Sequence, residues 1–161
     1  EKPELYIPPK KGKKHILRII RELIEFKPQT KGTNIRGALD YFNNVIKKRS
    51  IAFVISDFLD NRFEDQLKIT ARKHDLVALQ ISDHGEYELP KVGWIQIEDL
   101  ESDQLKWVNT NSSKNRKEYK KQGLAHDHYL KNIFRRSGVD FAKVRTDQSY
   151  VQPLMNLFKN R

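Results

Sequence analysis

The chain has 161 residues, 37% of them hydrophobic and 32% charged, which suits a single folded domain with a sizeable core. It contains no cysteine, so a disulfide scaffold and a thiolate metal site are excluded, and we expect a protein of the reducing cytoplasm. The formal net charge of +10 favours acidic partners, and no apolar run approaches the length of about 20 residues that a membrane span needs.

Two amphipathic helices are predicted in the first third of the chain. Apolar residues recur at helical spacing over residues 15–26, and Pro28 ends this helix because the residue before a proline disfavours helical backbone. A polar loop follows, and residues 35–46 repeat the pattern. Thr33 or Asn34 can cap the free N–H groups of this second helix.

The middle of the chain predicts two buried strands with a helix between them. Residues 51–55 and 76–81 are continuous apolar runs, typical of strands buried on both faces of a parallel sheet. A helix over residues 62–73 separates them. This alternation indicates a doubly wound α/β fold, which we assign to one domain over residues 1–161.

The last third departs from the simple alternation. Residues 93–97 and 105–108 predict a hairpin, and residues 113–136 a long helix. The apolar side of that helix is thin and is interrupted by Gly123, so we expect it to pack on the surface. A last strand over residues 139–144 and a helix holding residues 150–158 complete the chain.

Three segments together resemble a known family. They are Ile7-Pro8-Pro9-Lys10-Lys11-Gly12 before a helix, Gly32-Thr33-Asn34-Ile35 opening another, and Val54-Ile55-Ser56-Asp57-Phe58 ending a strand. Their order resembles the bacterial Domain of Unknown Function 58 family, which has a von Willebrand factor A-like domain. The resemblance covers nearly the whole chain. It implies a partial doubly wound, Rossmann-like sheet, mostly parallel and flanked by helices, with a C-terminal hairpin and helices.

The resemblance also implies part of a metal-ion-dependent adhesion site. The family's first loop, Asp-x-Ser-x-Ser, has no counterpart here, so the resemblance implies that residues 1–161 begin after it. The second and third loops match Thr33 and Asp57, whose hard oxygens suit Mg²⁺. A helix cap for Thr33 and a turn cap for Asp57 are the alternatives. We expect Mg²⁺ to belong to the complete protein and to bind this chain weakly or not at all.

The function that the resemblance implies is a non-catalytic protein-interaction module whose partner is a MoxR-type AAA ATPase. The alternative is a basic nucleic-acid-binding domain, because lysines and arginines gather at residues 10–14, 47–49 and 114–121. We expect no enzyme. The acidic group of Asp57, Asp60, Glu64 and Asp65 is interpreted as the start of a helix and not as a nuclease site. His126-Asp127-His128 is interpreted as solvated surface.

One consequence concerns assembly. If strands that precede residue 1 in a complete domain are absent, the strand from Ile51 lacks a neighbour on one side. Unpaired strand edges invite association. We therefore expect this chain to form a homodimer, to exchange an element between copies, or to cover that edge in another way.

Overall fold

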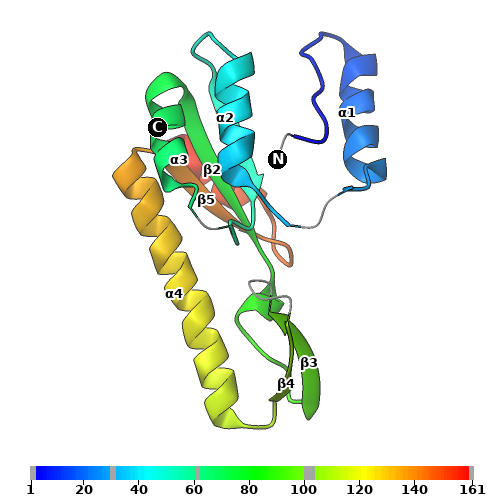
Figure 1. The fold of residues 1–161 in the computed structure, drawn as a ribbon, viewed down its shortest axis with the longest axis vertical. Helices are drawn as coiled ribbons and strands as arrows, with labels where there is room; N and C mark the ends of the chain where they lie inside the picture. Colours follow the sequence, from blue (N-terminus) through cyan, green and yellow to red (C-terminus); the bar gives the residue numbers. More distant parts are fainter. Residues whose placement is uncertain (1–2, 30–31, 61, 100–103, 160–161) are drawn as a thin grey trace.

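The centre of the protein is a parallel sheet of three strands, β1 (Ile51–Ser56), β2 (Asp75–Ser82) and β5 (Asp140–Arg145), in the order β1-β2-β5 (Figure 1). The structure is a computed structural model that describes residues 3–29, 32–60, 62–99 and 104–159. Helical crossovers join the parallel strands, as the alternation of the sequence predicts, so the α/β class is confirmed.

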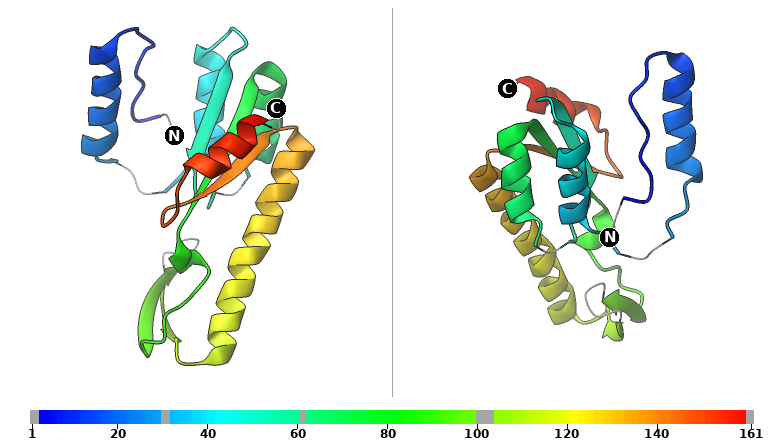
Figure 2. Two further views of the ribbon diagram at one scale, coloured as in Figure 1. Left: turned by 180° about the vertical axis from the view of Figure 1, so that it is seen from behind. Right: turned by 45° about the horizontal axis from the view of Figure 1, so that its top comes forward.

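Helices cover the two faces of this sheet (Figure 2). On one face lie α2 (Ile35–Val45), α3 (Glu64–Lys73) and the end of α4 (Ser113–Ser137), and on the other lies α5 (Val151–Lys159). Successive side chains of β2 point to opposite faces of the sheet. Leu76 and Ala78 pack in the core under α2 to α4, whereas Val77 and Leu79 pack with Leu157 of α5. The sheet is therefore wound on both faces.

The long helix α4 and the hairpin of β3 (Trp94–Asp99) and β4 (Gln104–Asn109) form an arm that extends beyond the sheet (Figure 1). A short 3₁₀ turn, η1 (His84–Glu86), leads from β2 into it. Ser112 caps the start of α4, and Gly138 ends it with a φ of 64°, the left-handed conformation typical of helix ends. Only the C-terminal part of α4 reaches the core, through Leu130, Ile133 and Phe134.

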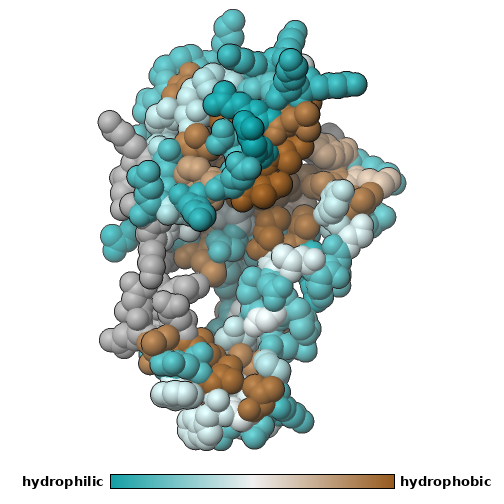
Figure 3. All heavy atoms as spheres, turned by 90° about the vertical axis from the view of Figure 1, so that its right-hand side faces the viewer, coloured by the Kyte–Doolittle hydropathy of each residue, from teal (hydrophilic) through white to brown (hydrophobic). Residues whose placement is uncertain are grey.

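The first helix, α1 (Lys13–Glu25), stands apart from the sheet (Figures 1 and 2). None of its residues is buried, although its sequence is strongly amphipathic. Leu23 and Ile24 are each 78% exposed. Hydrophobic side chains gather around this helix and, separately, over the hairpin at the other end of the molecule (Figure 3).

One burial expectation was wrong. The strand β1 is not buried on both faces: Ala52 is buried, but Ile51, Phe53 and Ile55 are 46–64% exposed. Two features of the fold explain this. Helix α5 crosses the sheet mainly over β2 and β5, and β1 is an edge strand that pairs only with β2 among the described residues. An apolar run indicates what a strand is able to bury and does not indicate what lies over it.

Candidate functional site: the carboxyl rim of the sheet

The three parallel strands end at one edge of the sheet, the carboxyl rim, where open α/β sheets bind ligands. Asp57 follows β1, Asp83 follows β2, and Thr146 follows β5. The N-terminus of α2 adjoins the same rim. The rim therefore carries polar side chains from four separate segments.

The loop after β1 is held in a fixed conformation. Asp57 is exposed, and its Oδ1 accepts hydrogen bonds from the Ser56 hydroxyl at 3.3 Å and the Leu59 N–H at 3.2 Å. Phe58 adopts a φ of 57°, which is strained for a residue with a bulky side chain. Its ring is fully buried against Phe63 and Phe134. Burial of this ring holds the strained backbone and so fixes where Asp57 lies.

A hydrogen bond joins the loops that carry Thr33 and Asp57. The Ile35 N–H donates to Oδ2 of Asp60 at 2.7 Å, and Asn34 caps α2 by accepting from the Gly37 N–H at 2.7 Å. A carboxylate at a helix N-terminus also interacts favourably with the helix dipole. Thr33 lies one residue before the cap and is exposed. Both predicted ligand loops therefore lie on the same rim, and Asn34 caps the helix.

The donors at this rim match a hard cation in kind but are few. A hydroxyl and a carboxylate are ligands that Mg²⁺ accepts, whereas the ion requires about six oxygens in near-octahedral geometry. Asp60 is already engaged with the backbone of α2. In the part of the chain that the structure describes, no three acidic or histidine side chains are grouped as metal ligands. Thr33 and Asp57 alone make an incomplete site.

The rest of the rim is closed by contacts among its own side chains. The Thr146 hydroxyl donates to Asp83 at 2.6 Å, and this bond, together with the Gly85 N–H, lowers the pKa of the Asp83 carboxyl. Arg145 forms a two-pronged ion pair with Asp147, with distances of 2.9 and 2.6 Å. The bond from Thr146 to Asp83 fixes the loop after β5 to the loop after β2, whereas the Arg145–Asp147 pair lies within the segment that ends β5.

A second polar cluster lies behind the rim, between the sheet and α4; we call it the Asp127 network. The Lys143 ammonium donates to Asp127 at 2.5 Å and to the Tyr87 hydroxyl at 2.6 Å. Tyr87 and Gln80 each donate to the other Asp127 oxygen at 2.9 Å. Gln80 and Lys143 are register partners on β2 and β5. Side chains from β2, from the segment after η1, from α4 and from β5 thus meet at one carboxylate.

The protonation states in this network are fixed by its hydrogen bonds. Partial burial would raise the pKa of Asp127, but the bonds from Lys143, Gln80 and Tyr87 outweigh it, and the pKa is lowered. Burial likewise works against the charged form of Lys143, yet its bonds to Asp127 and Tyr87 raise its pKa. Burial raises the pKa of the Tyr87 hydroxyl. At neutral pH the network is therefore an ion pair with a neutral tyrosine.

The interpretation of residues 126–128 as solvated surface was wrong for Asp127. That interpretation considered the two histidine rings and not the residue between them. Asp127 lies three residues before Leu130 and seven before Phe134, which places it on the inner face of α4. Its side chain is 23% exposed. Helical spacing from the buried residues of α4 is the signal in the sequence that indicates this.

Gly123 is what permits the network to form. A Cβ at this position would lie 2.7 Å from the carbonyl oxygen of Glu86 and 3.0 Å from the ring of Tyr87. The missing side chain lets α4 approach the 3₁₀ turn closely, and Tyr87 then reaches Asp127, one helical turn further along. The glycine that interrupts the apolar pattern of α4 therefore marks a close contact.

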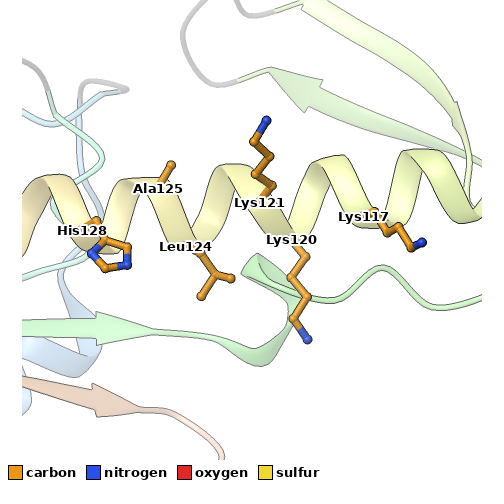
Figure 4. A pocket seen from close by; sticks show the side chains of 6 residues that line it. All are labelled: Lys117, Lys120, Lys121, Leu124, Ala125 and His128. Carbon is orange, nitrogen blue, oxygen red and sulfur yellow. The ribbon is translucent and has the colours of Figure 1, made fainter.

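The basic residues of α4 are spread around the helix. A shallow hollow on it is lined by Lys117, Lys120, Lys121, Leu124, Ala125 and His128 (Figure 4). Lys120 and Lys121 point to different sides of the helix, and Lys120 pairs with Glu88 at 2.9 Å (Figure 4). No described helix is long and apolar enough to cross a membrane.

The fold and its rim define an α/β protein with a parallel sheet and an inserted helix–hairpin arm. The chain belongs to the family described as "Protein of unknown function DUF58", which matches residues 1–129, so the expected family is confirmed. No solved structure matches the chain.

The chain is also similar to mycobacterial proteins. It is 25% identical over 129 residues to Uncharacterized protein MAV169 of Mycobacterium avium, covering 80% of this chain and 76% of that protein. It is 24% identical over 160 residues to Uncharacterized protein Mb1516 of Mycobacterium bovis and to Uncharacterized protein Rv1480 of Mycobacterium tuberculosis. These matches cover 96% of this chain and 50% of each relative, so the chain spans about half the length of those two proteins.

Proposed function

We propose that this chain is part of a von Willebrand factor A-like protein-interaction module that engages its partner at the carboxyl rim, without catalysis. The observation that carries the proposal is the 2.7 Å hydrogen bond from Ile35 to Asp60, which joins the loops of Thr33 and Asp57. A hydroxyl and a carboxylate from separate loops at the carboxyl ends of parallel strands suit a ligand shared with another molecule.

In this proposal Thr33 and Asp57 supply two oxygens of a Mg²⁺ site, directly or through water, and a carboxylate of the partner completes the coordination. When bound, the ion links two acidic groups that would otherwise repel each other. The chain's own residues fix the positions of the ligands: Phe58 anchors the Asp57 loop, and Asp60 ties it to α2. The partner that we propose is a MoxR-type AAA ATPase, in the cytoplasm.

The test is binding to a purified MoxR-type AAA ATPase of the same organism, with Mg²⁺ and with EDTA. Loss of one ligand of a shared ion typically costs about tenfold or more in affinity, so we expect Asp57→Asn to weaken binding to that degree. The matched control is Asp65→Asn, since the Asp65 side chain is 96% exposed outside the rim. Binding that survives both EDTA and Asp57→Asn rejects the metal-bridged mode.

Binding of Mg²⁺ to the chain alone is a further measurement. Because Thr33 and Asp57 supply only two of the oxygens that the ion requires, calorimetry should show weak Mg²⁺ binding or none; sub-micromolar affinity contradicts this expectation. A gel shift with duplex DNA tests the nucleic-acid alternative. Non-specific binding through lysines falls steeply with salt, so a complex that survives about 150 mM salt favours that alternative.

A further inference from the structure

The outer edge of β5 is open. In the order β1-β2-β5 this strand pairs with β2 on one side and with no described strand on the other. The Thr146 N–H donates to the Ser82 carbonyl at 3.0 Å, and in a parallel ladder every second residue bonds to the same neighbour. The backbone N–H and C=O groups of Phe141 and Lys143 therefore point away from β2, and they have no hydrogen-bond partner among the described residues.

Two helices turn this edge into a groove, which we call the β5 groove. The C-terminal part of α4 and helix α5 pack on opposite faces of the sheet beside β5 (Figure 2). Between them is a hollow of about 660 Å³ along residues 138–143, a volume within the range of protein ligand sites. Helix α4 contributes Lys131 and Arg135 to the wall, and α5 contributes Pro153 and Leu157. The groove follows the start of β5, whereas the carboxyl rim lies beyond its end.

The charges in the β5 groove indicate an acidic ligand. Lys131 and Arg135 are exposed, and neither side chain forms an ion pair or a hydrogen bond with another described residue. The other charged residues of the groove are already engaged, because Lys143 pairs with Asp127 and Asp140 has an interaction of its own. A free strand edge binds an extended backbone, and two unpaired cations beside it bind carboxylates.

Spacing indicates the form of that ligand. Residues four apart on a helix have Cβ atoms about 5–6 Å apart, and residues two apart on a strand lie about 6.5–7 Å apart on one face. Acidic residues at alternate positions of an added strand thus match Lys131 and Arg135, and the residue between them faces Pro153 and Leu157. The β5 strand of a second copy would bring the same two cations to the groove, which disfavours it. We propose that the β5 groove binds an extended acidic segment of a protein partner, which adds a strand to the sheet.

A synthetic peptide supplies the probe. It is about seven residues long, carries a fluorescent label, and alternates glutamate with valine. The full chain is titrated into it, and anisotropy reports binding. We expect binding that weakens as salt is added, because exposed charges contribute to it. We also expect the amides of Phe141 and Lys143 to exchange hydrogen more slowly in the complex, measured by NMR, because the added strand accepts their N–H groups.

Variants locate the binding. Lys131→Ala with Arg135→Ala should weaken it about five- to tenfold, as the loss of two exposed charge pairs typically does. The matched control is Lys117→Ala with Lys121→Ala, which has the same spacing on α4 and the same change of charge but lies outside the groove (Figure 4). This control should leave the affinity nearly unchanged. Circular dichroism checks that each variant is folded.

Changes in the peptide test the mode of binding. Methylation of every second backbone nitrogen gives two peptides of unchanged charge. The one that loses the N–H groups facing β5 should not bind, and the other should bind nearly as the parent does, because only one set of N–H groups of an added strand pairs with the edge. Equal binding of the two methylated peptides would reduce the contact to charge attraction and overturn the proposal.

Three other results also overturn it. One is an equal loss of affinity in the groove variant and in its control. Another is displacement of the peptide by duplex DNA without any protection of the Phe141 and Lys143 amides, which would assign the two cations to a nucleic acid. The third is protection of these amides that rises with protein concentration in the absence of peptide, which would assign the edge to a second copy. None of these measurements depends on Mg²⁺ or on Asp57, so the proposed function is tested separately.

Discussion

At the scale of single residues, Asp127 shows how one carboxylate connects distant parts of the chain. It accepts hydrogen bonds from β2, from the segment after η1, and from β5. Asp127 and Lys143 are 23% and 29% exposed, so each is partly removed from water and depends on the other. Removal of one member of such a pair leaves the other charged and underpaired, which destabilises a fold more than the pair stabilises it.

We expect Asp127→Asn to lower the free energy of unfolding by about 1–3 kcal/mol at neutral pH, as the loss of a charged hydrogen-bond acceptor typically does. Urea denaturation measures this. Glu118→Gln, which removes a charge from an exposed position of the same helix, is the control and should have a much smaller effect. An equal effect of the two substitutions would contradict a special role of Asp127.

The same network predicts how stability depends on pH. The pKa of Asp127 is lowered, so its contribution is present above the unfolded value of about 3.9 and is lost as pH falls through the folded value. The pKa of Lys143 is raised, so its contribution is present below about 10.4 and is lost as pH rises through the folded value. Asp127→Asn should therefore flatten the acid side of the stability profile, measured by urea denaturation at a series of pH values.

At the scale of elements, the position of α4 depends on Gly123. Glycine is disfavoured inside a helix by about 1 kcal/mol relative to alanine, so helix propensity alone favours its replacement. The close approach of the Glu86 carbonyl opposes this, because a backbone atom 2.7 Å from a Cβ moves only if the turn or the helix shifts. Overpacking of this kind typically costs about 1–3 kcal/mol.

Gly123→Ala should therefore destabilise the protein by about 1 kcal/mol or more and disturb the Asp127 network. Thermal unfolding gives the stability, and the tyrosine titration reports on Tyr87. Gln122→Ala, at the exposed neighbouring position, provides the comparison and should be neutral or slightly stabilising. A stabilising Gly123→Ala would show that α4 and the 3₁₀ turn lie further apart than in this structure.

At the scale of the whole molecule, the most consequential feature is the outer edge of β1. The strand has no second neighbour among the described residues, and Ile51 and Ile55 on its outer face are 63% and 64% exposed. Basic residues precede β1 and Asp57 follows it, so an antiparallel pair of such strands would bring opposite charges together at both ends. The edge therefore suits association of two copies.

We propose that two copies associate through this edge. Sedimentation should show a dimer at micromolar concentration, and Ile55→Glu should shift the protein towards monomer, because charged side chains on an edge strand disfavour its pairing with another chain. Since the chain has no cysteine, Ile55→Cys also reports on contact between copies through disulfide formation. Val92→Glu, at another exposed apolar position, is the control. A monomer at all concentrations would refute this association.

The sequence by itself determined the order and type of the elements, the parallel α/β class, and the family. These follow from local periodicity: apolar runs and helical spacing are properties of neighbouring residues, and the boundaries agree with the structure within about two residues. It also placed the loops of Thr33 and Asp57 on one rim, because parallel strands end at the same edge.

Only the tertiary structure decided which side chains meet across the chain. The partners of Asp127 lie 16 to 47 residues away, and the link from Ile35 to Asp60 spans 25 residues. Such contacts depend on how helices cross the sheet, which local pattern does not encode. The exposure of the outer face of β1 also depends on how a helix crosses the sheet. The residues of the strand specify an apolar surface, and the packing of α5 decides which part of it is covered.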